Sequence, residues 1–522
     1  MKKIFLSLIA CAGLGLTSCD MNTTQFGVID DSETLNYDYA TNFRNYAVYS
    51  CIRTMTTGAW VYDADLQCDQ FIGLSNNGGR GMNGFGDGFL TSSNGDVDGC
   101  YGGCYSRIAQ VNYYIDAAQS LLNAGTLTAD ETTEVKRYLG EAYFARAYYY
   151  SWLQMHFCGN YDEATADQEG LGLCLVKVYN PDGNPSSYPG RSSMNETISF
   201  IEGDLEAAFT ALKAYEDAGN TNFTKAGANY LSSYAVAALH ARFALNIGKN
   251  AVAAQKADYV IGNANYSLAT LQDYVDMWKD ENVDELIFAP YVDQSESSTL
   301  ASLCQGWNYY WATANQSDFI PTEDTVYSLA EYEDSEGYIN DIRFVAFLNN
   351  TAINVANGTT KGYAFNKYPG VPGLSTGTNM YLNKPKPFRL SEMYLVKAEA
   401  AALTQDVAGA NAALNTLVKA RMIEPADFED FDLVGNELIE TIRSERGKEL
   451  MGEGFRTMDL RRWKQGFDRN VPYDINPYIA EMRSPNGLNV KYAADDYRYV
   501  WPIPSSEMEI NPQLKGQQNP GY

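Results

Sequence analysis

Histidine is scarce in this sequence of 522 residues, which contains only His156 and His240. Both lie in stretches that we predict to be helical, and neither forms a metalloprotease His pair or a zinc-ligand spacing with the cysteines. A G-x-S-x-G nucleophile turn and a P-loop are also missing, and no strand precedes Gly84–Gly88 as it would precede a dinucleotide-binding loop. These absences leave carboxylate chemistry open, because a glycosidase needs only two acidic side chains about 5–10 Å apart.

Long hydrophobic runs and positive charge are also in short supply. The apolar stretch Ile4–Leu16 is shorter than the roughly 20 residues that span a bilayer, so we predict no transmembrane helix in the mature chain. The sequence has 38 Lys and Arg against 65 Asp and Glu. Such an acidic surface repels phosphate backbones, which excludes nucleic-acid binding as the function.

The N-terminus resembles a bacterial lipoprotein signal. A positively charged start and a short apolar segment lead to Leu16-Thr17-Ser18-Cys19, the pattern in which a peptidase cuts before a cysteine that is then acylated. We therefore predict a signal peptide over 1–18, lipidation of Cys19 and a polar tether over 19–35. Acyl chains contribute about 0.8 kcal/mol per buried methylene, so two or three of them would anchor the protein to a membrane. The alternative is an ordinary secretory signal with an incidental cysteine.

Cysteine gives no sign of a disulfide framework. Nine are present, and removing Cys11 and Cys19 leaves an odd number that cannot all pair. A chain of this size needs no disulfides for stability. Cys100 and Cys104 could form a bridge, but we expect free, buried thiols.

Several alanine-rich stretches carry apolar residues at helical spacing. Two pairs of such stretches are joined by short loops, and they are roughly Ala226–Ile247 with Asn250–Ile261 and Arg389–Leu403 with Val407–Arg421. A further helix near Asn195–Tyr215 is expected to pair with one at 131–157. Paired alanine-rich helices of this length resemble tetratricopeptide (TPR) units. The pattern predicts a mainly α fold, a superhelix of TPR-like helical pairs.

Long stretches rich in Gly, Asn and Pro interrupt the predicted helices. The TPR-like helices cover about 131–262 and 387–465, and the loop-rich parts cover about 54–103 and 290–386. Because the helices and loops alternate along the chain, we predict one unit over 36–522 rather than a string of domains. Loops this long are often functional, so we expect the irregular parts to bind the ligand.

Specific motifs follow one another along the chain. They are Leu139–Ala147 (LGEAYFARA), Asn366-Lys367-Tyr368, Pro387–Ala400 (PFRLSEMYLVKAEA), Ile442–Trp463 (beginning IRSERGKELMGEGFR), Trp501-Pro502-Ile503-Pro504 and the ending Gln518–Tyr522. Together they resemble the SusD/RagB family of nutrient-binding lipoproteins. We interpret the 442–463 segment as structural, with Glu453–Arg456 and Asp459–Arg462 as local ion pairs at i,i+3. Glu445 or Glu449 as a general acid is the less favoured alternative.

The resemblance implies an outer-membrane lipoprotein that faces the cell exterior and touches the membrane only through its lipid anchor. Family members bind oligosaccharides, or peptides in some branches, and cover a SusC-like TonB-dependent barrel that imports the ligand. The resemblance implies no cofactor and no catalysis. We therefore predict glycan binding, with a peptide-binding RagB-like protein and a secreted glycosidase as alternatives.

Two aromatic clusters could contact a sugar, whose ring has a polar rim and apolar faces. The first is Trp307, Asn308, Tyr309, Tyr310 and Trp311, which places both tryptophans on one surface whether it is extended or helical. The second is Trp60, Tyr62 and Asp65, which combines rings with a carboxylate that could accept sugar hydroxyls. In both clusters the alternative is that the residues pack or cap the loop.

One short segment imitates a calcium-binding loop. Asn94–Gly99 has the start of the pattern, but Tyr105 stands where the bidentate glutamate should be. We interpret it as an Asp/Asn turn and assign no metal ligand.

Overall fold

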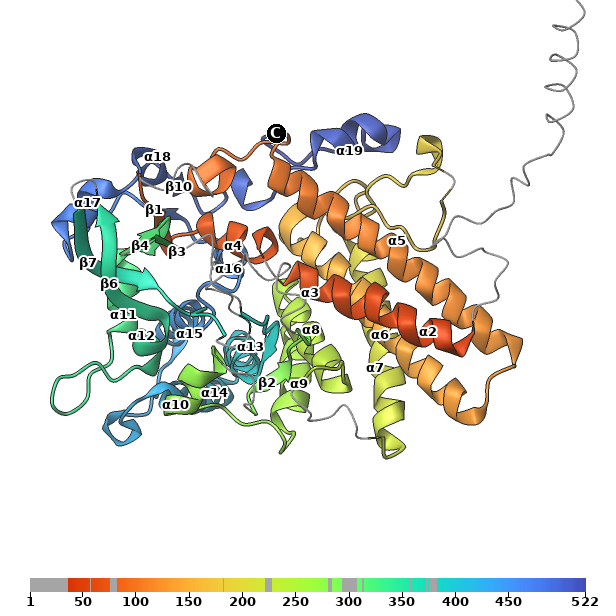
Figure 1. The fold of residues 1–522 in the computed structure, drawn as a ribbon, viewed down its shortest axis with the longest axis horizontal. Coiled ribbons are helices and arrows are strands. Elements are labelled where there is room, and N and C mark those ends of the chain that lie inside the picture. Colours follow the sequence, from red (N-terminus) through yellow and green to blue (C-terminus); the bar gives the residue numbers. More distant parts are fainter. Residues whose placement is uncertain are drawn as a thin grey trace, which may run out of the picture.

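The computed structural model describes residues 36–522 except 57, 76–81, 182, 221–227, 280–283, 293–307, 312–313, 356–357, 372–373 and 375–382. Within these residues the chain is mainly helical (Figure 1). No helix in the described part is both long and apolar enough to cross a bilayer. The predicted signal peptide, Cys19 and the tether lie outside the described residues.

A layer of N-terminal helices comes first. It contains α2 (Tyr37–Arg44), the π-helical turn η1 (Asn45–Ser50), α3 (Cys51–Met55), α4 (Ala59–Leu66), a second π-helical turn η2 (Met82–Gly86) and α5 (Gly95–Ala124). The Asn94 side chain begins α5 by accepting hydrogen bonds from the backbone N–H groups of Asp96 and Val97. Asn94–Gly99 is therefore a helix start, which confirms an Asn turn there. The expectation of an irregular 54–103 is wrong for α4 and for the first residues of α5.

Antiparallel helices form the scaffold, as predicted. They are α6 (Ala129–Phe157), α7 (Met194–Asp217), α8 (Ser233–Asn246), α9 (Asn250–Ile261), α13 (Leu390–Leu403), α14 (Val407–Arg421), α15 (Gly435–Glu449) and α16 (Arg456–Trp463). Capping boxes start both α6 and α7, at Thr128 and Ser193. Each helix packs on the next in the series α6, α7, α8, α9, α13, α14. The predicted pairs are confirmed, and their buried alanines lie in two hydrophobic clusters, one around α6–α9 and one around α13–α15.

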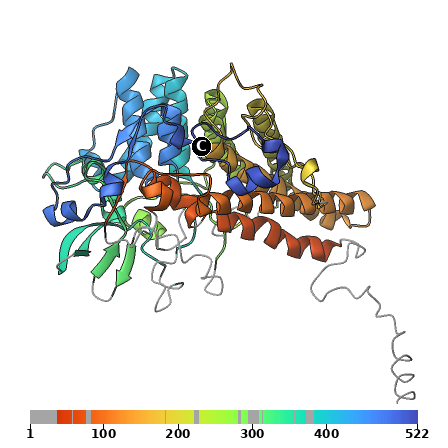
Figure 2. The same cartoon turned by 90° about the horizontal axis from the view of Figure 1, so that it is seen from above.

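Strands occupy part of the 290–386 stretch, which we had expected to be irregular. A four-stranded sheet has the order β3 (Asn308–Trp311), β4 (Ala314–Ser317), β6 (Leu348–Val355) and β7 (Gly358–Phe365). The β3–β4 and β6–β7 pairs are antiparallel, and β4–β6 is parallel. Separately, β1 (Phe71–Gly73) pairs with β5 (Phe319–Pro321). Figure 2 shows the four-stranded sheet and α2 on one side of the molecule, opposite the helical pairs.

Shorter elements complete the described chain. They are α10 (Leu271–Met277), β2 (Leu286–Phe288), α11 (Glu323–Leu329), α12 (Ile342–Phe347), β8 (Phe388–Arg389), β9 (Phe467–Asp468), α17 (Pro477–Met482), α18 (Pro485–Leu488), β10 (Lys491–Tyr492), α19 (Ser505–Ile510) and the 3-10 turns at Pro185–Ser187, Pro425–Asp427, Tyr497–Tyr499 and Pro512–Leu514. The strand β2 pairs with β8, and β9 pairs with β10.

The C-terminal segment returns to the N-terminal half as an extended strap. Trp501 is fully buried, and its backbone N–H donates to the carbonyl of His156 while its indole N–H donates to Gln67 Oε1. The described cysteines, Cys51, Cys68, Cys100, Cys104, Cys158 and Cys174, are free and buried, as expected.

Buried ion pairs link parts of the chain that are far apart. Glu449 lies 2.8 Å from Arg389 and 3.0 Å from Arg421, and Glu445 lies 2.7 Å from Arg343. Burial alone would raise the pKa of Glu449, but the charges of Arg421 and Arg389 outweigh burial and hold it well below its ordinary value. Both glutamates are thus charged partners inside the scaffold, which supports the structural interpretation of this segment.

One of the two local ion pairs predicted in this segment is wrong. Glu453 pairs with Arg389 at 2.5 Å and with Lys367 at 2.6 Å, whereas Arg456 pairs with Asp69 at 2.8 Å. The chain turns between α15 and α16, so the i,i+3 spacing of a helix does not apply there. The Asp459–Arg462 pair, within α16, is confirmed at 2.8 Å.

Candidate functional site

The helix α4 holds Trp60 at the centre of the molecule. Its indole meets that of Trp152 on α6 edge-on, with ring centroids 4.9 Å apart, and the guanidinium of Arg107 lies 5.4 Å from the Trp60 ring centroid. A Cβ at Gly103 would lie 2.9 Å from Trp60, so the ring fits only because α5 carries a glycine there. Trp60 is half-buried in a fixed orientation.

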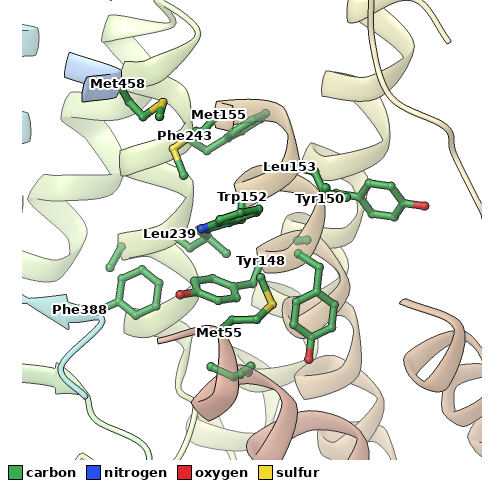
Figure 3. Close-up of a cluster of buried hydrophobic side chains, with 14 of the residues drawn as sticks. Met55, Tyr148, Tyr150, Trp152, Leu153, Met155, Leu239, Phe243, Phe388 and Met458 are labelled. Atoms are coloured by element: carbon green, nitrogen blue, oxygen red, sulfur yellow. The ribbon is translucent and has the colours of Figure 1, made fainter. Parts of the chain in front are cut away.

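Trp60 forms part of the wall of a central cavity of about 70 Å³. Aromatic rings from distant segments form part of the other walls: Tyr148, Trp152 and His156 of α6, then Trp278, Tyr368 and Phe455. Figure 3 shows Tyr148 and Trp152 projecting from α6 toward Leu239 of α8 and Phe388 of β8, with Met55 of α3 nearby. Trp60, Val61 and Gly454 are half-exposed, so the cavity reaches the surface beside α4.

Two buried ring nitrogens on the cavity wall have no hydrogen-bond partner, namely His156 Nε2 and Trp278 Nε1. Burial lowers the pKa of His156 to about 3, so its ring is neutral at physiological pH. His156 Nδ1 lies 2.8 Å from the Trp152 carbonyl and must donate to it, which makes Nε2 an acceptor. The residues of the wall therefore include one buried acceptor and one buried donor that no protein group satisfies, which together are the complement of a hydroxyl group.

Two charged side chains on the cavity wall, Arg242 and Glu453, are already paired. Arg242 binds both carboxylate oxygens of Glu392 at 2.6 Å, and Glu453 binds Arg389 and Lys367. Burial lowers the pKa of Lys367 to about 8, although the neighbouring Glu453 charge opposes this. Glu453 is the one carboxylate among the described lining residues, whereas glycosidic cleavage needs two.

The size of the cavity limits what it encloses. About 70 Å³ accommodates a few water molecules, whereas pockets for drug-sized ligands hold about 300–1,000 Å³. An oligomeric ligand would therefore lie across the opening beside Trp60, with only a small part of it reaching the ring nitrogens.

The three residues of the predicted cluster, Trp60, Tyr62 and Asp65, have different surroundings in the structure. Tyr62 is half-buried and does not line the cavity, and burial raises its pKa. Asp65 is fully buried, and one of its carboxylate oxygens accepts the Gly454 N–H at 2.7 Å. Asp65 cannot meet a ligand in this position, so its assignment as a sugar contact is corrected to a structural one.

The other cluster is described only in part. Trp307 lies outside the described residues, while Asn308, Tyr309, Tyr310 and Trp311 form β3, so the backbone takes the extended alternative. The strand β1 follows α4, and β5 follows β4. Because β1 pairs with β5, the described parts of the two candidate segments lie on the same side of the molecule (Figure 1).

Most of the rings that line the cavity have no feature in the sequence that marks them as ligand-binding residues. Tyr148 and Trp152 lie in a helical pattern that predicts ordinary core positions, and Trp278 stands apart from any other signal. Tyr368 belongs to the Asn366-Lys367-Tyr368 motif, which was not assigned to the binding site. The only available hint was the dense aromatic run between Tyr148 and Phe157. Among the described residues, no group of three or more His, Cys, Asp or Glu side chains is arranged to hold a metal ion.

Two family models match the chain. One is described as the SusD family and matches residues 306–522; the other is described as starch-binding associating with outer membrane and matches residues 87–245. No curated protein matched.

Solved structures confirm the mainly α, SusD-like fold. A SusD superfamily protein from Bacteroides thetaiotaomicron VPI-5482 is 23% identical, with a TM-score of 0.74 over 93% of this chain and 100% of its own. A SusD-like carbohydrate binding protein from Bacteroides vulgatus ATCC 8482 is 18% identical, with a TM-score of 0.71 over 92% and 98%. A laminarin binding SusD-like protein is 19% identical, with a TM-score of 0.65 over 93% and 99%.

Proposed function

Because the chain belongs to the SusD/RagB family, we propose that it is a glycan-binding lipoprotein of the outer membrane that delivers its ligand to a SusC-like TonB-dependent transporter. The observation that carries the glycan assignment is the ring-lined cavity beside Trp60. Its rings can stack on the apolar face of a sugar, and its unpartnered donor and acceptor can bind a hydroxyl group.

The lipid anchor and the second ligand contact are proposed mainly from the sequence. Acylation at Cys19 would place Asn36, the first described residue, at the end of a short tether, on the exterior side of the membrane. We also propose that Trp307, Asn308, Tyr309, Tyr310 and Trp311 add a second contact for a longer glycan. The pairing of β1, which follows α4, with β5, which follows β4, supports this for the part of the segment in β3.

Calorimetry on the mature chain with a panel of glycans tests this proposal. The panel includes laminarin and starch oligosaccharides, because one similar structure is a laminarin binding protein and one matching family is described as starch-binding. We expect Trp60→Ala to weaken binding about tenfold or more, because it removes a stacking ring worth at least about 1.4 kcal/mol. Tyr338→Ala, which removes a ring that is 67% exposed elsewhere, is the control and should leave the affinity unchanged.

Several outcomes would contradict the proposal. Binding of peptides alone would favour the RagB-like alternative, and release of reducing ends would show a glycosidase. Equal affinity in wild type and Trp60→Ala would remove the central cavity from the site. Co-purification of a TonB-dependent barrel with the acylated protein from outer membranes would test the transporter partnership.

A further inference from the structure

A second and larger cavity lies between α16, the 159–171 segment and the C-terminal strap. Its volume is about 460 Å³, and its walls are Gly159, Asn160, Asp162, Thr165, Ala166, Leu171, Arg191, Met194, Arg461, Lys464, Ala494–Tyr497, Tyr499, Val500, Asn519 and Pro520. None of these residues lines the central cavity. The walls contain three cationic side chains, although the whole protein has a net charge of −27.

Arg461 is the most unusual of these cations. It is 5% exposed, its Nη1 donates to the Cys158 carbonyl at 2.8 Å, and its Nε has no hydrogen-bond partner. No carboxylate forms an ion pair with it in the described part of the chain, and burial lowers its pKa to about 10. A buried arginine without a counter-ion is costly, which makes it a candidate for pairing with a bound anion.

Arg191 adds a second buried positive charge to the same wall. It is 4% exposed, and its guanidinium donates to the carbonyls of Gly172 and Gln517 and to the amide oxygen of Asn519. These neutral acceptors fix the side chain but leave its charge uncompensated. Lys464 ends α16 in a left-handed conformation, is exposed, and also lines the cavity.

The acidic side chains on the walls form an ion pair or hydrogen bonds with other groups, or lie at the surface. Asp496 pairs with Arg498 at 2.7 Å, and Asp162 accepts hydrogen bonds from the Ala164 N–H and the Thr165 hydroxyl. Asp495 is exposed. Asn160 adds a buried amide oxygen without a partner.

Aromatic surface borders these charges. Tyr497 lines the cavity and is 46% exposed, and its ring meets that of Tyr522 edge-on at 5.2 Å. A ring at the entrance and a desolvated guanidinium inside match a small molecule with one apolar face and one oxyanion. We propose that this cavity binds an acidic saccharide unit, with Arg461 and Lys464 contacting its carboxylate or sulfate and Tyr497 contacting its ring.

This inference rests on the proposed glycan-binding function, to which it adds a second site for charged sugars. The two proposals fail independently, because they use different residues. The central cavity depends on Trp60, and the second cavity depends on Arg461 and Lys464.

Calorimetry with D-glucuronate, glucose 6-sulfate and glucose tests the assignment. We expect both anionic sugars to bind at least about tenfold more tightly than glucose. Arg461→Gln should weaken binding of the anions by about tenfold or more, and Lys464→Gln by roughly two- to fivefold, as for an exposed ion pair. Tyr338→Ala, which lies outside both cavities, should leave glucuronate binding unchanged. Preference for one of the two anions would identify carboxylate or sulfate as the natural group.

Lys464→Gln is the safeguard if Arg461→Gln does not fold, because Lys464 is exposed. Arg461→Lys, which keeps the charge but loses the fork of donors, provides an intermediate case. The inference is overturned if glucose binds as tightly as the anions, or if Lys464→Gln and the folded Arg461 variant bind glucuronate like the wild type. It is also overturned if Trp60→Ala abolishes glucuronate binding, because the central cavity would then be the site.

Discussion

Asp65 illustrates how burial changes the role of a single side chain. The residue is fully buried, one carboxylate oxygen accepts the Gly454 N–H, and the other has no partner. Burial raises the pKa of Asp65 to about 7, against an ordinary value near 3.8. The folded state therefore holds this proton more tightly than the unfolded state does, and the residue lowers stability as the pH rises from about 4 to 7.

Replacing Asp65 with Asn should stabilise the protein at alkaline pH. Asn keeps an acceptor for Gly454 but cannot ionise, so Asp65→Asn should gain about 2–4 kcal/mol at pH 8 and little at pH 4. Urea unfolding at the two pH values measures the difference. Asp432→Asn, at an exposed loop position, is the control for simple charge removal. A loss of stability at both pH values would show that the carboxylate itself is needed.

The same residue shows what the sequence could not reveal about the candidate site. Trp60 and Asp65 are five positions apart on α4, yet one reaches the cavity and the other is buried against Gly454. That difference depends on the segment at 453–455, nearly 400 positions away. Local pattern predicts a ring beside a carboxylate, but only tertiary packing decides which of them meets a ligand.

Among the elements, the contact between α6 and α7 depends on one glycine. A Cβ added to Gly140 would lie 2.7 Å from the Cβ of Ala211, closer than side chains normally approach. Gly140→Ala should therefore separate the two helices and cost about 1–3 kcal/mol, despite the better helix propensity of Ala.

Gly203→Ala is the matched control, since Gly203 also lies within α7 but has open space around it. It should stabilise the protein by about 0.5–1 kcal/mol. Thermal unfolding of both variants gives the comparison. Equal stabilisation by the two substitutions would mean that the α6–α7 spacing is not limited by this contact.

Helices and strands differ in how well the sequence predicts them. The pairs α8–α9 and α13–α14 were predicted to within a few residues, apart from the start of α8, because apolar periodicity and short loops are local signals. No helix was predicted over α5, and its start was assigned to a loop because Gly95, Gly99, Gly102 and Gly103 have low helix propensity, which the Asn94 cap and packing overcome. The β4–β6 pair joins residues nearly 40 positions apart, which no local pattern reports.

Across the whole molecule, buried charges connect the helical scaffold to the rest of the chain. Glu445 lies between Arg343, before the sheet strand β6, and Lys448 of its own helix. Burial alone would raise the pKa of Glu445, but the charges of Arg343 and Lys448 lower it to about 2. The stabilisation from this carboxylate is thus fully present above about pH 4.5 and is lost as the pH falls toward 2.

Glu445→Gln should consequently destabilise the protein most at neutral pH. Removing this carboxylate leaves Arg343 with Asp341 and Lys448 with Glu331 as their remaining partners, at a cost of up to about 5 kcal/mol. Because protonated Glu resembles Gln, the gap in unfolding free energy between wild type and variant should shrink between pH 4.5 and pH 2. Glu440→Gln, which breaks an exposed pair with Arg443 on the same helix, should change stability by no more than about 0.5 kcal/mol. A gap that stays constant with pH would show that Glu445 acts through its shape and hydrogen bonds rather than its charge.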